Sequence, residues 1–270
     1  MALRLLVADS AAQMQAARDV EARVFMEAFG NTPPLMEREY GPYADRSRFV
    51  VVVDDRDGTG VGVVRLVLPD ASGELKTLTD VAGAPWHLSV PDSLRAAGLA
   101  GRPVVDVATL AVAPEHRRAA AGPEVMLALL HGSYRWSLNS GFEGMVAVLD
   151  DHVLAHIQAT GTPFTALPGA TSQFYLGSPA STPCLCLFAG IVDIVRARRP
   201  ELLPALDGGV FRTIAVDAAD LLPHRGGTAG TTRRPLVAPG NRPGYRPAHR
   251  RSRVVEAPTA AAGLVPSTTE

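Results

Sequence analysis

The chain has 270 residues, of which 47% are hydrophobic and 20% are charged, a composition ample for a folded core. Its formal net charge of −1 excludes a general electrostatic affinity for nucleic acid or for an anionic membrane. The charge is uneven, because eight Arg and two Glu give residues 223–270 about +6 and leave about −7 for residues 1–222. We therefore predict an acidic folded domain over residues 1–222 and a basic tail over residues 223–270.

The tail is dominated by Pro, Gly, Thr, Arg and Ala without periodicity, which predicts a disordered or extended arm. The two cysteines, Cys184 and Cys186, cannot form a disulfide framework for a chain of this length. The N-terminus lacks the pattern of a signal peptide, and the longest apolar stretch, residues 184–195, is too short to cross a bilayer. We expect a cytoplasmic protein without stable membrane insertion, and the Arg-rich, Ala-rich composition is typical of a GC-rich bacterial genome.

Hydrophobic periodicity predicts alternating strands and helices. In the first half the pattern indicates a strand at 3–7, a helix at 11–29, a loop or short helix at 31–46, strands at 49–53 and 61–68, and short helices near 75–81 and 91–97. In the second half it indicates strands at 103–112, 144–149, 164–167, 183–188 and 210–216, and helices at 123–139, 151–161 and 192–206. This order predicts an α/β (α+β) fold with a central twisted mixed sheet of about seven strands flanked by helices.

The segment with the clearest chemical signal is a buried strand, a short basic turn of small residues and a helix, over residues 104–125. Backbone N–H groups at a helix N-terminus bind phosphate when small residues allow close approach. Guanidinium groups in the turn add charge where a pyrophosphate would lie. An ordinary strand-to-helix loop with surface arginines is the alternative. The predicted cofactor-binding residues are Val112, Arg117, Arg118, Ala119, Ala120, Ala121 and Gly122.

Residues 110–122, LAVAPEHRRAAAG, resemble the acyl-CoA-binding signature of the GNAT superfamily, in which a strand leads into Arg-x-x-Gly-x-Gly. Arg117 matches the Arg position and Gly122 the last Gly, whereas Ala120 replaces the first Gly. The resemblance covers residues 17–200. It implies an acyl-CoA N-acyltransferase fold with a thioester donor, either acyl-CoA or an acyl carrier protein.

A narrower resemblance connects the chain to the acyl-homoserine-lactone synthases and the long-chain N-acyl amino acid synthases. In that branch a strand reading Glu-x-x-Arg-Leu-Ala-Val carries the catalytic carboxylate, and the matching positions here are Asp106 and Thr109. The loss of Arg at position 109 argues against lactone synthesis. Segments 161–164 and 175–177 resemble the half of the family fold that shapes the acyl pocket, which implies a medium-to-long chain.

An amine that attacks a thioester must lose a proton to a base. Asp106 is the candidate, since burial raises a carboxyl pKa; the alternative is a structural carboxylate paired with Arg65 or Arg102. The resemblance implies backbone N–H donors for the oxyanion between Leu110 and Val112. It also implies that Tyr175 can protonate the leaving thiolate, although a packing role is the alternative.

Three further positions, Asp45, Arg65 and Thr109, are candidates for binding the substrate, with an ordinary ion pair between Asp45 and Arg65 as the alternative. His152 and His156 have a spacing that can hold a metal, but no third ligand is evident nearby and no metal is expected. Cys184 and Cys186 are either buried strand residues or thiols for a double-displacement route.

These features predict an N-acyltransferase that moves a medium- to long-chain acyl group to the amine of a small acceptor such as an amino acid. Acyl carrier protein is a possible partner, nucleic acid is not expected, and the oligomeric state stays open. Two alternatives remain. One is a catalytically degenerate acyl-CoA-binding or partner subunit, favoured by Ala120 and Thr109. The other is a short-chain N-acetyltransferase.

Overall fold

The computed structural model describes residues 3–117 and 122–223, so the predicted tail lies outside the described residues except for Pro223. The described residues form a nine-stranded mixed sheet in the order β6-β8-β5-β4-β3-β2-β1-β9, with β7 paired to β8. The β4–β5 and β1–β9 pairs are parallel, and the other pairs are antiparallel. The strands are β1 (Leu3–Val7), β2 (Ser47–Asp54), β3 (Gly60–Val67), β4 (Val104–Val112), β5 (Gly144–Asp150), β6 (Thr165–Ala166), β7 (Gln173–Tyr175), β8 (Ser178–Leu187) and β9 (Ile214–Val216).

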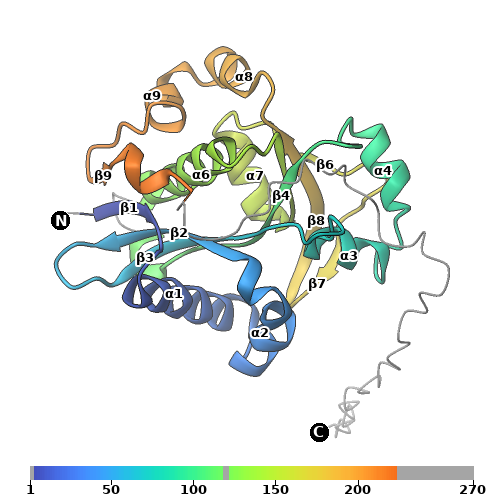
Figure 1. Cartoon of the computed structure of the whole chain (residues 1–270), viewed down its shortest axis with the longest axis horizontal. Helices are drawn as coiled ribbons and strands as arrows, with labels where there is room; N and C mark the ends of the chain where they lie inside the picture. The colour runs from blue at the N-terminus through green and yellow to red at the C-terminus, as the bar shows by residue number, and fades with distance from the viewer. Residues whose placement is uncertain (1–2, 118–121, 224–270) are drawn as a thin grey trace, which may run out of the picture. The chain divides into compact units, whose positions relative to one another are not determined.

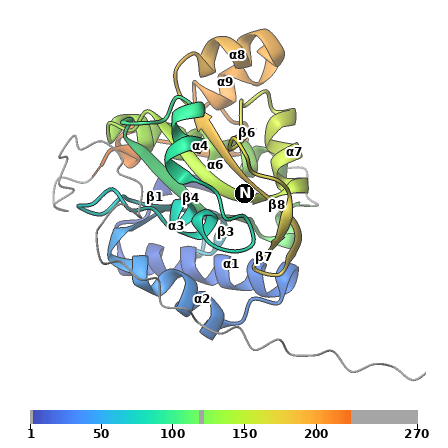
Figure 2. The same ribbon diagram turned by 90° about the vertical axis from the view of Figure 1, so that its right-hand side faces the viewer.

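Helices cover both faces of the sheet. Helices α1 and α2 lie on one face and α6, α8 and α9 on the opposite face in both views (Figures 1 and 2). The α-helices are α1 (Ala11–Phe29), α2 (Pro33–Tyr40), α3 (Lys76–Ala82), α4 (Val90–Ala96), α5 (Pro114–Arg117), α6 (Gly122–Asn139), α7 (Asp151–Ala159), α8 (Ile191–Arg198) and α9 (Leu203–Leu206). Single 3₁₀ turns span Gly41–Arg46, Pro200–Leu202 and Ala218–Leu221.

Strand β2 shows why the sheet is covered on both faces. Its side chains alternate between the faces, as the two-residue period of a strand requires. Phe49 and Val51 pack in the cluster that contains the apolar face of α1, and Val50 and Val52 pack in the cluster that contains α6. A strand that is apolar at consecutive positions is therefore buried on both sides.

The expected mixed sheet flanked by helices is confirmed, and most element positions agree with the sequence prediction. Three differences have local causes. The helix predicted over 192–206 breaks after Arg198, because Pro200 has no N–H to donate and ends α8. Strand β7 was not predicted, since three residues carry too little periodicity. The sheet has nine strands rather than about seven, because it contains all eight predicted strand segments and also β7.

Helix α6 lies close to the sheet because Gly132 faces it. A Cβ at this position would come within 2.7 Å of Val50 Cγ1 and 3.1 Å of Leu5 Cδ2, both in the buried core. The glycine thus sets the distance between the helix and strands β1 and β2.

We predict that Gly132→Ala destabilises the protein by about 1–2 kcal/mol. Alanine favours a helix by about 1 kcal/mol over glycine, but overpacking a closed core costs about 1–3 kcal/mol. Urea unfolding measures the change, with Leu138→Ala at an exposed position of α6 as the control. An increase in the unfolding midpoint of Gly132→Ala would contradict this packing.

Candidate functional site

Strands β4 and β5 run side by side and then part. They pair from Val104 with Gly144 to Val107 with Ala147, and no pairing follows although β4 continues to Val112 and β5 to Asp150 within the described chain. The parting coincides with an irregularity between β3 and β4, where Arg65 pairs with Thr109 but Leu66 pairs with Val107, so that Ala108 is bulged. A bulge bends its strand and strengthens the local twist.

The parting leaves backbone amides of β4 facing away from the sheet. Ala113 N donates to Val61 O at 2.9 Å, so this N–H points toward β3. Because N–H directions alternate along an antiparallel strand, the amides of Leu110 and Val112 point to the side from which β5 has departed. These are the groups that the resemblance implies as oxyanion donors.

An apolar pocket lies on the α6 face of this opening. It has a volume of about 690 Å³, its open mouth included. Its walls combine β4 and β5 with the helices α6, α7, α8 and α9, and Asp207 is its one ionised carboxylate among the described residues. The lining residues are Val64, Val107, Leu110, Leu130, Ser133, Tyr134, Met145, Leu149, Ile157, Thr162, Phe164, Cys186, Phe188, Ile191, Val192, Val195, Leu203, Leu206 and Asp207.

A second pocket, of about 520 Å³ with its mouth, adjoins the first, since Val107, Leu110 and Leu149 line both. It lies toward α1 and mixes aromatic rings with hydroxyl groups and one carboxylate. Its remaining lining residues are Phe25, Phe29, Tyr40, Ala108, Thr109, Val148, Asp150, Val153, Tyr175, Leu176, Ser178 and Ser181. The two pockets thus share part of their walls, next to the outward-facing amide of Leu110.

The predicted cofactor loop is described only at its two ends. Arg117 Nε donates to Val112 O at 2.7 Å, and so caps a carbonyl that points out of the sheet. Gly122 begins α6, and a Cβ there would come within 2.4 Å of His116 O, so the start of α6 lies against the backbone of α5. Arg118, Ala119, Ala120 and Ala121 lie outside the described residues.

Asp106 is fully buried and is held by the first turn of α3. Its carboxylate accepts from Thr77 N at 2.5 Å and from Thr77 Oγ1 at 2.8 Å. Burial raises the pKa of Asp106 to about 7, although the bonds from Thr77 oppose the shift. Its partner is neither Arg65 nor Arg102, the two partners considered from the sequence, and it lines neither pocket. Asp106 thus acts as a cap for α3, whose own N-cap, Leu75, has no side-chain acceptor.

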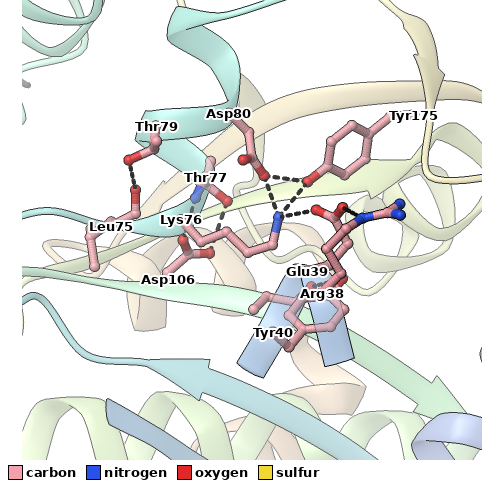
Figure 3. Close-up of polar contacts among 11 residues, drawn as sticks. Arg38, Glu39, Tyr40, Leu75, Lys76, Thr77, Thr79, Asp80, Asp106 and Tyr175 are labelled. Atoms are coloured by element: carbon pink, nitrogen blue, oxygen red, sulfur yellow. Dashed lines mark hydrogen bonds and ion pairs between the residues drawn. The ribbon is translucent and has the colours of Figure 1, made fainter. Parts of the chain in front are cut away.

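Tyr175 belongs to a second cluster on the same helix (Figure 3). Its hydroxyl donates to Asp80 and accepts from Lys76 Nζ at 3.1 Å, and Lys76 also contacts Asp80 at 2.5 Å and Glu39 at 3.5 Å. Burial, followed by the charge of Asp80, keeps the pKa of Tyr175 well above its usual value. Tyr175 lines the second pocket, but its hydroxyl donates its proton to Asp80 and does not point it at a leaving thiolate.

Arg65 forms a buried ion pair with Glu21 instead of Asp45. The contact is bidentate, at 2.9 Å from Nε and 2.5 Å from Nη2, and Thr109 Oγ1 donates to the same Glu21 carboxylate. Asp45 is exposed, and Arg48 donates to its backbone carbonyl at 3.3 Å. Among the three predicted substrate-binding residues, only Thr109 lines the second pocket.

The other candidates remain separate from the opening. His152 and His156 are exposed on α7, and the described residues contain no group of three His, Cys, Asp or Glu side chains that could hold a metal ion. Cys184 and Cys186 are buried and free, and burial raises the pKa of Cys186 to about 12. In the described part of the chain, no helix has the length and apolarity to cross a bilayer.

The sequence analysis did not identify Glu21, Lys76 or Asp150 as site residues. Glu21 lies among Ala17, Val20 and Val24 on the buried face of α1. An acidic residue within that apolar period is the sequence signal that indicates a buried carboxylate. Lys76 is the only Lys of the chain. Asp150 is the N-cap of α7, and a helix cap is the ordinary reading of an Asp before a predicted helix.

No protein-family model and no curated protein matches the chain. Among solved structures it is similar to FeeM, an N-acyl amino acid synthase from uncultured soil microbes, at a TM-score of 0.54 and 12% identity, over 71% of this chain and 93% of that chain. It is also similar to the acyl-homoserine-lactone synthase LasI, at a TM-score of 0.50 and 15% identity, over 78% of this chain and 96% of that chain. The GNAT-like fold expected from residues 110–122 is confirmed.

We predict that Asp106→Asn changes the pH dependence of stability. The folded pKa of about 7 exceeds the ordinary 3.8, so the folded state holds a proton that the unfolded chain releases, and this stabilisation is lost as pH rises from about 4 to about 7. Between pH 4 and pH 8 the native protein should lose ~4 kcal/mol relative to the variant, whose amide still accepts from Thr77.

Denaturant unfolding at each pH measures this difference. Asp92→Asn is the control, because bonds from Ser89 and then Arg95 lower the pKa of the exposed Asp92, so the contribution of Asp92 to stability is complete above about pH 4 and stays constant to pH 8. Parallel stability curves for Asp106→Asn and the native protein would show that Asp106 is ionised throughout.

Proposed function

We propose that this chain is an N-acyltransferase that moves an acyl group from a CoA or acyl carrier protein thioester to a small amine. The observation that carries the proposal is the meeting of two pockets at the parting of β4 and β5, beside the outward-facing amide of Leu110. Acyl transfer needs two binding sites that meet at one carbonyl and a donor for its oxyanion. The solved structures with this fold include an N-acyl amino acid synthase and an acyl-homoserine-lactone synthase.

The thioester would lie along the outer edge of β4 and the start of α6. There the N–H groups of Leu110 and Val112 are free to donate to the thioester oxygen, and α6 offers the N-terminus of an 18-residue helix to the diphosphate. Arg117 and Gly122 flank this helix start. Residues 118–121, which the resemblance of residues 110–122 assigns to the anion site, lie outside the described residues.

The apolar pocket supports a medium or long acyl chain over acetyl. Nearly all of its lining side chains are hydrocarbon, and the lining extends from Leu110 on β4 to residues of α8 and α9. Each methylene buried there contributes about 0.8 kcal/mol to binding, so longer acyl chains bind more tightly until the pocket is filled.

In this proposal Asp106 and Tyr175 are positioning residues. Both are held by α3, Asp106 through Thr77 and Tyr175 through Asp80 and Lys76 (Figure 3). Helix α3 thereby ties β4 to β7 at the edge of the second pocket. The hydroxyl proton of Tyr175 is directed at Asp80, and Asp106 lines neither pocket.

The same observation favours a second candidate function, a non-catalytic protein that binds acyl thioesters. If neither Asp106 nor Tyr175 transfers protons, the chain keeps both pockets but loses the base and acid implied by the family resemblance. Thioester binding without release of CoA in the presence of amines is the outcome that separates this candidate from the transferase.

We predict that acyl-CoA turnover increases with chain length from acetyl to octanoyl or longer. Two additional buried methylenes are worth about 1.6 kcal/mol, or roughly tenfold in kcat/KM, until the pocket is filled. Released CoA is measured with a thiol reagent. The thiols of Cys184 and Cys186 are buried, so the folded protein gives no background in this assay.

Val192→Trp tests the pocket directly, because Val192 lines it and is only partly buried. The variant should lose at least tenfold in kcat/KM with octanoyl-CoA and keep its activity with acetyl-CoA. Asp193→Trp, at the exposed neighbouring position, is the matched control. Equal loss with both donors, or failure of every CoA thioester and acylated carrier protein to bind, would refute the proposed function.

A further inference from the structure

The second pocket carries a charge pattern that selects among acceptor amines. Of the described residues that line it, Asp150 alone has a carboxyl or basic side chain. Its neighbours in the lining are uncharged hydroxyls and aromatic or aliphatic groups. Among the described residues, the lining of this pocket therefore presents one carboxylate and no cation.

The two nearest cations are already paired. Lys76 contacts Asp80 at 2.5 Å and Glu39 at 3.5 Å, so two carboxylates face one ammonium behind Tyr175. Arg65 is held by both oxygens of Glu21 and lies between the rings of Tyr40 and Phe49, at 5.0 and 4.6 Å from their centroids. Drawing Arg65 toward a substrate would leave the buried Glu21 unpaired, and drawing Lys76 away would remove the cation of the half-buried Asp80 and Glu39.

Asp150 itself is held in a fixed position at the end of β5. Its Oδ1 accepts from His152 N at 2.9 Å and Val153 N at 3.4 Å, and its Oδ2 accepts from Ser178 Oγ at 2.8 Å. Ser181 Oγ donates in turn to Ser178 Oγ at 2.9 Å, and both serines are buried pocket residues. A carboxylate accepts about four hydrogen bonds, so Asp150 keeps capacity for one more donor on the pocket side.

We infer that the acceptor is a primary amine with an aromatic or aliphatic body and without a carboxylate, and that Asp150 binds its ammonium group. This inference rests on the proposed acyltransferase function and narrows its acceptor from any small amine. A carboxylate on the acceptor would lie in a half-buried pocket against Asp150 with no counter-ion, which is repulsive and costs desolvation. The rings of Phe25, Phe29 and Tyr175 supply the surface for the acceptor body.

The same placement gives Asp150 a role in the reaction. Asp150 lines the second pocket directly after Leu149, a residue that lines both pockets. Asp150 accepts one proton from the ammonium, and the freed nitrogen attacks the thioester carbonyl. The tetrahedral adduct loses a second N–H proton to solvent as the C–S bond breaks. The thiolate leaves and is protonated by solvent, so one amide, one thiol and one released proton result from one ammonium and one thioester.

Three acceptors that share one aromatic body test the inference: 2-phenylethylamine, phenylalanine methyl ester and phenylalanine. With octanoyl-CoA as donor, kcat/KM should be at least tenfold higher for the amine and the ester than for the amino acid. The ester restores the α-substituent without its charge, so it separates repulsion from steric exclusion. A preference for phenylalanine over both would overturn the inference and leave the acyltransferase proposal intact.

Asp150→Asn should lower kcat/KM for 2-phenylethylamine about 100-fold, the usual effect of losing a general base, while octanoyl-CoA binding measured by calorimetry stays unchanged. Asparagine is a good N-cap, so α7 and the fold are retained. Asp151→Asn, one residue on, is the control, because Asp151 contacts Ser172 and Thr182 and does not line the pocket. Unchanged turnover in Asp150→Asn, or binding of the thioester without transfer to any of the three acceptors, would overturn the inference. Absence of thioester binding would instead refute the proposed function.

Discussion

The parting of β4 from β5 after Val107 and Ala147 is the constraint on which the site depends. If the two strands stayed paired, β5 would satisfy the amide of Leu110, and side chains of the two strands would close the space between the pockets. The bulge at Ala108 accompanies the parting and allows both Val107 and Leu110 to face the apolar pocket, although they are three residues apart. A local irregularity in one strand thus gives a buried sheet an accessible backbone donor.

Buried charges around this opening are arranged as closed pairs. Glu21 is satisfied by Arg65 and Thr109, and Asp80 by Lys76 and Tyr175. Unpaired charges in such positions would be costly, so each pair also restrains the elements that carry it. Helix α3 is too short to be stable alone, and its contacts with β4, through Asp106, and with β7 hold it in place. The scaffold therefore supplies rigidity, while Asp150 is left as the charged group at the surface of the second pocket.

The fold was largely predictable from the sequence because its signals are local. Continuous apolar runs such as that of β2 indicate strands buried on both faces, and the period of α1, ended by Gly30, gives its bounds directly. The elements that were not predicted are those without a clear local signal. A three-residue strand such as β7 has no measurable period, and the break at Pro200 divides a segment whose apolar spacing continues through it.

The sequence alone determined that Asp106 would be buried in a strand, that residues 110–122 lead from this strand into a helix, and that the whole would form a mixed sheet between helices. Only the tertiary structure decided which partner each charge has. Asp106 meets Thr77 and Arg65 meets Glu21, over separations of 29 and 44 residues, because partner choice depends on how strands and helices are placed in space. Periodicity reports burial at a position, whereas an ion pair or a pocket is a property of several distant positions at once.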